Sequence, residues 1–131
     1  MTIGRVVALT IRHARSSTIS DVDQCHAIDR TGLSTDIHAD ALSPRQLLLA
    51  SAAIYQDLAL PPHALRENLL VDFETACLGS GTVLQIGAEV RLRIMFQCEA
   101  CGQLDRVQPR LAQRIGNRRG MLARVLAGGQ V

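Results

Sequence analysis

Two cysteines three residues apart, Cys98 and Cys101, have the clearest capacity for chemistry in this sequence. They follow Val90–Gln97, a segment in which apolar and polar residues alternate. One C-x-x-C supplies only half of a zinc site, and Cys25-His26 could complete it only if both side chains faced the same way, which neighbours on a strand do not. A thioredoxin-type pair would open a helix in a βαβ setting, which this pair does not. A zinc site, a ligand for a soft or high-valent metal, and two ordinary thiols remain open.

Polar residues also gather before three short apolar runs. Asp36, His38 and Arg45 lie in a loop rich in Gly, Ser and Thr that leads into the first run. Arg66-Glu67-Asn68 precedes the second run, where the Asn and Glu side chains could simply hold a turn through bonds to the backbone. Arg118-Arg119-Gly120 precedes the third, either as a solvated charge pair or as a phosphate clamp.

The basic residues narrow the chemistry further. All 14 are arginine, so an internal pyridoxal phosphate Schiff base is not expected, because the chain has no lysine. The net charge is only +2, yet the segment from Arg91 to the end carries eight Arg against Glu99 and Asp105. Coding bias explains an arginine-only composition, but guanidinium groups also bind phosphate in a bidentate fashion.

Composition indicates one soluble domain over residues 1–131. Hydrophobic residues make up 47% of the chain, but its aromatic residues are only Tyr55, Phe73 and Phe96, too few for a platform that stacks nucleic-acid bases. The apolar runs are too short to cross a bilayer, and Met1–Arg5 lacks a signal-peptide pattern. We therefore expect no nucleic-acid or membrane partner, a cytoplasmic location and reduced cysteines.

Hydrophobic patterning and turn residues predict a mainly β fold. Helices are expected over Ala52–Leu58, capped by Ser51, and over Arg110–Ile115 before Gly116. A long loop is expected over Asp29–Pro44. The predicted strands are Arg5–Arg12, Val22–Ile28, Gln46–Ala50, Asn68–Val71, Thr82–Ile86, Val90–Gln97 and, as the last one, Met121–Leu126. Many short strands with two or three short peripheral helices favour a closed or nearly closed β-barrel.

Taken in order, these motifs resemble the MOSC domain, named for the C-terminal domain of molybdenum cofactor sulfurase. The matching segments run from about residue 20 to the end of the chain, and they are Gly32–Asp36, Arg45–Ala50, Glu67-Asn68-Leu69, Thr82–Gly87, Cys101 and Arg119–Val125.

The resemblance implies a MOSC-type β-barrel that binds the molybdenum cofactor (molybdopterin). It implies Cys101 as the molybdenum ligand or sulfur carrier, in an oxidoreductase or a sulfur-transfer component served by an electron-donor or sulfur-donor protein. A non-catalytic cofactor carrier and a zinc or structural module built on Cys98 and Cys101 are the alternatives. The implied cofactor-binding residues are Asp36, His38, Arg45, Glu67, Asn68, Arg119 and Gly120, with Arg45, Asn68 and Arg119 expected to line one pocket.

Three departures from the family pattern bear on these expectations. Thr35 replaces the second loop glycine, and Ala100 precedes the cysteine where many relatives have proline. The sequence also stops at Val131, where the family adds a closing strand. An open barrel edge would be adhesive, so a homodimer is a further expectation.

Overall fold

Short strands predominate in the computed structural model, which describes residues 4–16 and 18–131. Most of the segment 1–5, where the sequence shows no signal-peptide pattern, therefore lies outside the described residues. The strands are β1 Val6–Arg12, β2 Ile19–Val22, β3 His26–Ile28, β4 Gly32–Leu33, β5 Leu47–Ser51, β6 Leu69–Val71, β7 Val83–Ile86, β8 Val90–Gln97, β9 Met121–Ala127 and β10 Gly129–Gln130. The helices are α1 Ala52–Asp57 and α2 Leu111–Ile115, and the 3₁₀ turns are η1 Thr75–Cys77 and η2 Gly102–Arg106.

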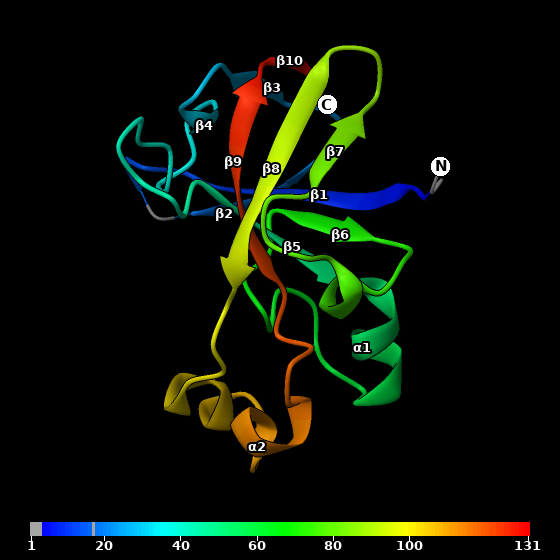
Figure 1. Cartoon of the computed structure of the whole chain (residues 1–131). Coiled ribbons are helices and arrows are strands. Elements are labelled where there is room, and N and C mark those ends of the chain that lie inside the picture. Colours follow the sequence, from blue (N-terminus) through cyan, green and yellow to red (C-terminus); the bar gives the residue numbers. More distant parts are fainter. Residues whose placement is uncertain (1–3, 17) are drawn as a thin grey trace.

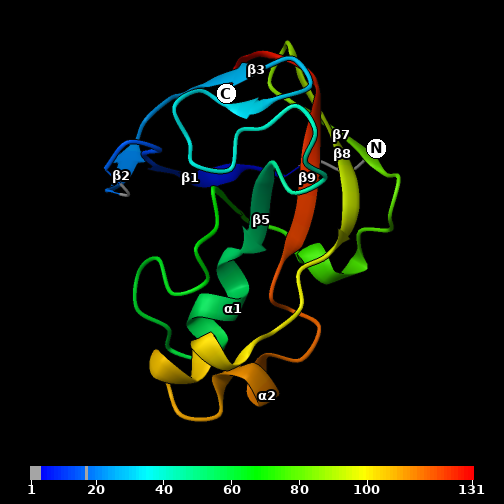
Figure 2. The same ribbon diagram turned by 90° about the vertical axis from the view of Figure 1, so that its left-hand side faces the viewer.

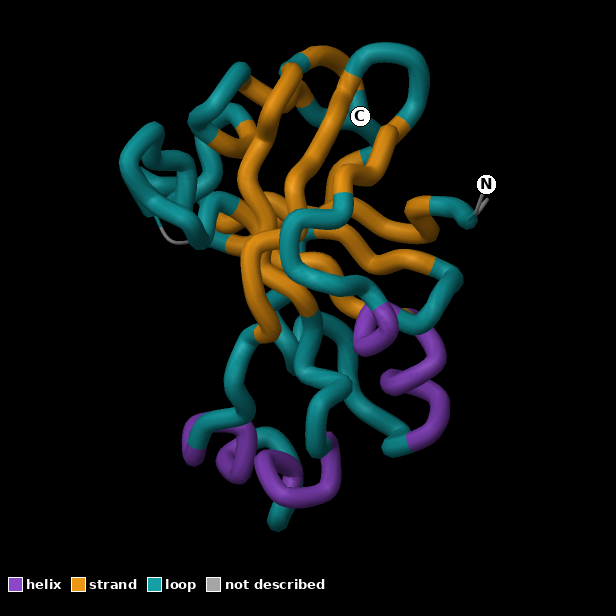
Figure 3. The backbone as a smooth tube through the Cα atoms, in the orientation of Figure 1, coloured by secondary structure: helices purple, strands orange, loops and turns teal. Residues whose placement is uncertain are grey.

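The strands form two sheets. The larger has the order β2-β1-β6-β5-β9-β8-β7 and curls into part of a barrel (Figures 1 and 3). Its pairs are antiparallel except β5 with β6, which run parallel. The smaller sheet, β10-β3-β4, lies at one end of the molecule, and α1 and α2 lie at the other (Figure 2). The predicted mainly β class with a barrel-like sheet and few short helices is confirmed. Within the described residues, no helix is long and apolar enough to cross a membrane.

The predicted hairpin of β7 and β8 is confirmed. The two strands pair antiparallel, with Leu84 opposite Leu92, and Gly87 takes a positive φ of 67° in the turn. Leu92 and Ile94 are buried inside the curled sheet, while Arg91 and Arg93 between them are exposed. The alternation of apolar and polar residues in the sequence therefore correctly predicts a strand with one face packed on the core.

Strand β5 is buried on both faces, and this matters for the site. Leu47 and Leu49 pack into the core of the curled sheet, which does not include Leu48. Leu48 pairs with Leu122 of β9, which is likewise buried but absent from that core. Since successive side chains on a strand point to opposite faces, this pair lies on the outer face of the sheet. Ser51 then caps α1 as predicted, its side chain accepting a bond from Ala53 N.

Two expectations about strands are wrong. Residues 22–28 do not form one strand, because the chain leaves the larger sheet after β2 and enters the smaller one at β3. The last strand is not 121–126, because β10 follows β9 and pairs with β3. Gly128 makes this change of sheet possible, since a Cβ there would lie 2.3 Å from Ala27 O. A glycine at a strand end here marks close backbone approach, not the end of pairing.

Asn68 ties three parts of the chain together just before β6. Its Nδ2 donates to Thr10 O and to Asp36 Oδ1, both at 3.1 Å, and its Oδ1 accepts from Leu48 N at 3.1 Å. These bonds join β1, β5 and the 34–46 loop, all around a side chain that is 5% exposed. Buried polar groups need hydrogen-bond partners, and Asn68 supplies them to all three segments at once. The Asn68 side chain therefore fixes where these segments meet.

Asn68→Ala should lower the free energy of unfolding by about 2–4 kcal/mol, because Leu48 N, Thr10 O and the Asp36 carboxylate each lose a buried hydrogen bond. Urea unfolding followed by circular dichroism measures the change, with Gln113→Ala, an exposed amide on α2, as the control. Equal midpoints for the two variants would contradict the structural role of Asn68.

Candidate functional site

A cavity of about 300 Å³ opens on the outer face of the larger sheet. Leu48 and Leu122 contribute an apolar floor, and polar residues from strand ends and loops contribute the walls. The residues lining it are Arg12, His38, Arg45, Leu47, Leu48, Arg66, Asn68, Cys98, Gln103, Arg119 and Leu122. An apolar base with a few convergent polar groups is the usual form of a small-molecule site.

The cavity is strongly cationic. Arg12, Arg45, Arg66 and Arg119 line it, together with His38, and no carboxylate is among the described residues of its wall. Arg45 lies with its guanidinium carbon 5.5 Å from the centre of the Phe96 ring, which holds the long side chain at the cavity by a cation–π contact. Charges of one sign in a recess raise the local potential and attract anions.

Arg119 is the most unusual of these residues, since it is only 8% exposed. Its Nε and Nη1 are buried with no hydrogen-bond partner among the described residues. Its neighbour Arg118, in contrast, pairs with Asp57 at 2.9 Å and Glu74 at 3.0 Å, on the side of α1 and η1. The two arginines therefore have different roles: Arg118 holds the turn, and Arg119 presents guanidinium nitrogens without hydrogen-bond partners to the cavity.

Gly120 explains how Arg119 reaches this position. Its φ is +129°, and a Cβ there would lie 2.5 Å from Leu49 O. Only glycine fits so close to the β5 backbone, and this close approach places Arg119, the preceding residue, at the cavity. Gly120 thus positions Arg119 through the backbone.

Asp36 organises the wall from behind the cavity. The carboxylate is buried and accepts bonds from Arg12 N at 2.9 Å and His38 N at 3.1 Å, besides the bond from Asn68. Burial raises the pKa of Asp36, but the hydrogen bonds from His38 and from Arg12 N outweigh it and hold that pKa below its usual value. Asp36 is absent from the cavity lining, and its negative charge faces the backbone of the loop and the His38 ring, whose Nδ1 lies 3.5 Å from Asp36 Oδ2.

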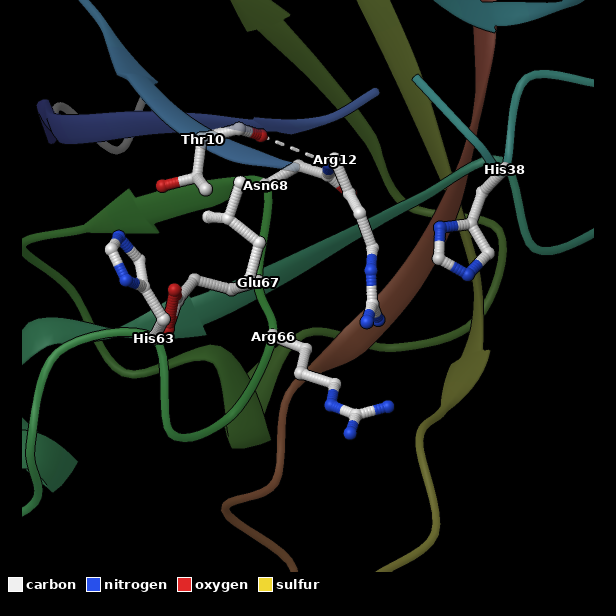
Figure 4. Close-up of a pocket in the computed structure, with 8 residues that line it drawn as sticks. Thr10, Arg12, His38, His63, Arg66, Glu67 and Asn68 are labelled. Carbon is white, nitrogen blue, oxygen red and sulfur yellow. Dashed lines mark hydrogen bonds between the residues drawn. The ribbon is translucent and has the colours of Figure 1, made fainter. Parts of the chain in front are cut away.

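A smaller pocket of about 20 Å³ adjoins the cavity and shares Arg12, His38, Arg66 and Asn68 with it. Figure 4 shows the side chains of Arg12, Arg66 and His38 around one space, with Glu67 and His63 on the far side of the pocket. The Glu67 carboxylate accepts a hydrogen bond from Tyr55 Oη, which itself accepts from Leu65 N at 3.1 Å. Burial raises the pKa of Glu67 above its usual value.

The two cysteines of the C-x-x-C segment lie in different surroundings. Cys98 follows β8 directly and lines the cavity, whereas Cys101 is exposed and precedes η2. Two residues further on, Gln103 lines the cavity. No group of three or more His, Cys, Asp or Glu side chains within the described residues could hold a metal ion, so the four ligands of a structural zinc site are not assembled.

The structure brings together most of the residues that the sequence singles out. Arg45, Asn68 and Arg119 line one cavity, as predicted, and His38 joins them. Asp36 and Gly120 lie behind the wall, Glu67 lines the smaller pocket, and Cys101 is not among the lining residues. Sequence reasoning missed Arg12, Arg66, Cys98 and Gln103 as lining residues. Only their positions at strand and motif boundaries could have suggested them.

Comparisons with known proteins agree with this architecture. Residues 35–131 match the family model of the MOSC domain. The crystal structure of the YuaD protein from Bacillus subtilis superposes with a TM-score of 0.84 at 18% identity, covering 98% of this chain and 90% of that one. YiiM from Geobacillus stearothermophilus superposes with a TM-score of 0.70 at 12% identity, covering 98% and 71%.

A third crystal structure, of a hypothetical protein, gives a TM-score of 0.77 at 22% identity, and this chain covers 64% of its length. At these identities the solved structures show a shared fold. None of the curated proteins matches the sequence.

Replacing Glu67 by Gln should make stability less dependent on pH. Because the folded pKa of Glu67 lies above its unfolded value, the folded state holds more protons between the two values, and stability falls as the pH rises through this window. The wild type should therefore lose stability relative to Glu67→Gln from about pH 4 upwards. Urea unfolding at a series of pH values checks this, with Glu99→Gln at an exposed position as the control. A constant difference across pH would contradict the expectation.

Proposed function

Because the chain belongs to the MOSC domain family, we propose that its arginine-lined cavity binds the molybdenum cofactor. The observation that carries the proposal is Arg119, a buried guanidinium whose Nε and Nη1 have no partner in the described part of the chain. Leaving such a group unpaired is costly, so the site is prepared for an anion that accepts its hydrogen bonds. The phosphate of a pterin cofactor is an anion of this kind.

The residues of the cavity fit such a group in three respects. Arg45 adds positive charge beside Arg119 and suits a phosphate. Leu48 and Leu122 offer an apolar surface to an organic ring. Cys98 lines the cavity and Cys101 follows three residues later, so soft sulfur ligands are available in this region. Such ligands suit molybdenum better than they suit a hard cation.

Each residue then has a defined task. Arg119 and Arg45 bind and orient the anionic end of the cofactor, Asn68 and Asp36 keep the wall in place, and the leucine pair excludes water from the floor. When bound, the cofactor supplies a redox-active metal. This combination suits an oxidoreductase or a sulfur-transfer component that works with an electron-donor or sulfur-donor protein in the cytoplasm. A carrier that binds the cofactor without turnover would use the same residues.

We propose Cys101 as the molybdenum ligand or sulfur carrier, because it matches the position of the family cysteine. The location of Cys98 in the cavity wall favours a second candidate for the same role. The two thiols differ in exposure and surroundings, so serine variants can separate them.

Arg119→Gln should reduce molybdenum retention about tenfold or more, the effect of losing a charge-assisted bond to an anion. Metal analysis of protein purified from a cofactor-producing host measures molybdenum per chain. Arg91→Gln removes the same charge from an exposed site on β8 and should retain molybdenum like the wild type. Full retention in Arg119→Gln, or no molybdenum in the wild type, would contradict the proposal.

Cys101→Ser should abolish molybdenum retention or turnover with a reduced electron donor, while Cys98→Ser and Cys77→Ser should leave both nearly intact. The reverse result for Cys98 and Cys101 would transfer the ligand role to the cavity-lining thiol. Equal loss of one zinc per chain in both variants would support the zinc module and overturn the cofactor assignment. Retention of metal with no turnover in the wild type would support the carrier.

A further inference from the structure

A second arginine with a buried, unpartnered side-chain nitrogen lies in the same cavity, contributed by a different part of the chain. Arg12 Nε is buried with no hydrogen-bond partner among the described residues, as Arg119 Nε is. Arg12 closes β1, whereas Arg119 precedes β9, and only Arg12 also lines the smaller pocket. The cavity therefore has two arginines, each with at least one buried guanidinium nitrogen that has no hydrogen-bond partner among the described residues.

The backbone of Arg12 is fully engaged, which leaves its side chain for the cavity. Its N donates to Asp36 Oδ1 at 2.9 Å, and its O accepts from Ile37 N at 2.7 Å. The 36–37 segment thus fixes Arg12 at the end of β1, and Figure 4 shows its guanidinium facing the same space as Arg66 and His38. Glu67, the carboxylate in the smaller pocket, accepts a hydrogen bond from Tyr55, and within the described residues it forms no ion pair with Arg12.

The charge of the cavity wall exceeds what one phosphate can balance. Four arginines give a formal charge of +4 among the described lining residues of the main cavity, and Glu67 in the adjoining smaller pocket offsets at most one of these charges. A phosphate ester carries up to two negative charges. Because like charges in a recess repel one another, a second anion would lower the energy of this arrangement.

We propose that Arg12, with Arg66 and His38, forms a second anion subsite that takes a negatively charged substrate, one bearing a carboxylate, phosphate or sulfate group. The subsite rests on the proposed function, in which the Arg119 end holds the phosphate of the cofactor. It deepens that function by assigning the substrate class. Arg12 binds the anionic group and thereby orients the rest of the substrate toward the cavity floor.

Arginine Nε–H signals in protein labelled with ¹⁵N-arginine test the subsite, with inorganic phosphate as the probe. In cofactor-free protein, the Arg12 and Arg119 signals should shift along two separate binding curves. Arg12→Gln should weaken one binding event about tenfold or more and leave the Arg119 curve in place. The variant keeps the backbone bonds of Arg12 and should fold. Arg91→Gln, the matched charge control, should leave both curves unchanged.

Cofactor-loaded protein distinguishes the two sources of an anionic group. Phosphate should still shift the Arg12 signal and no longer shift the Arg119 signal, because a substrate anion binds beside the cofactor. A single curve of one phosphate per chain in cofactor-free protein would overturn the subsite. Loss of the Arg12 response on loading would also overturn it, because both arginines would then serve the cofactor. Two phosphates per chain in a protein that retains no molybdenum would support the subsite and overturn the cofactor assignment instead.

Discussion

The hydrogen bonds of Asn68 and Asp36 are the constraint on which the rest of the site depends. Asn68 joins β1, β5 and the 34–46 loop through one buried amide, and Asp36 passes the connection to Arg12 N and His38 N. A buried polar network of this kind is stable only when each member is satisfied, so it admits one arrangement of the three segments. Asn68 and Asp36 thereby fix the positions of the segments that form the cavity wall. This structural role is separate from any contact that the Asn68 amide makes with a ligand.

The same hydrogen bonds determine where the negative charges near the cavity point. Asp36 accepts hydrogen bonds from Arg12 N, His38 N and Asn68 Nδ2, and Glu67 accepts one from the Tyr55 hydroxyl. Neither carboxylate forms an ion pair with a guanidinium group among the described residues that line the cavity. Arg118 takes up Asp57 and Glu74 on the opposite side of the turn. Acidic residues are therefore present near the cavity but directed elsewhere, and the cavity stays cationic although the chain as a whole carries only +2.

Sequence patterning predicts those features that depend on local alternation or turn chemistry. The β7–β8 hairpin, the Ser51 cap and the helix that ends at Gly116 are of this kind, because their signals lie within a few residues. The division of residues 22–28 between two sheets depends on the distant pairing of β3 with β10, which no local pattern carries. Arg12 is missed for the same reason. Its role comes from Asp36, 24 residues away, and from a cavity that exists only once β5 and β9 are paired.

The register of β5 links the core to the site. A strand with side chains on both faces can bury one row in the core and offer the other row to a neighbouring cavity. Leu47 and Leu49 fill the core, and Leu48 meets Leu122 beneath Arg119 and Arg45. A shift of one residue would exchange the two rows and turn Gln46 and Ala50 toward the core in place of Leu47 and Leu49. Gly120 opposes such a shift, because its backbone lies against Leu49 O and tolerates no side chain. The glycine that brings Arg119 over the floor thus also fixes which leucine forms it.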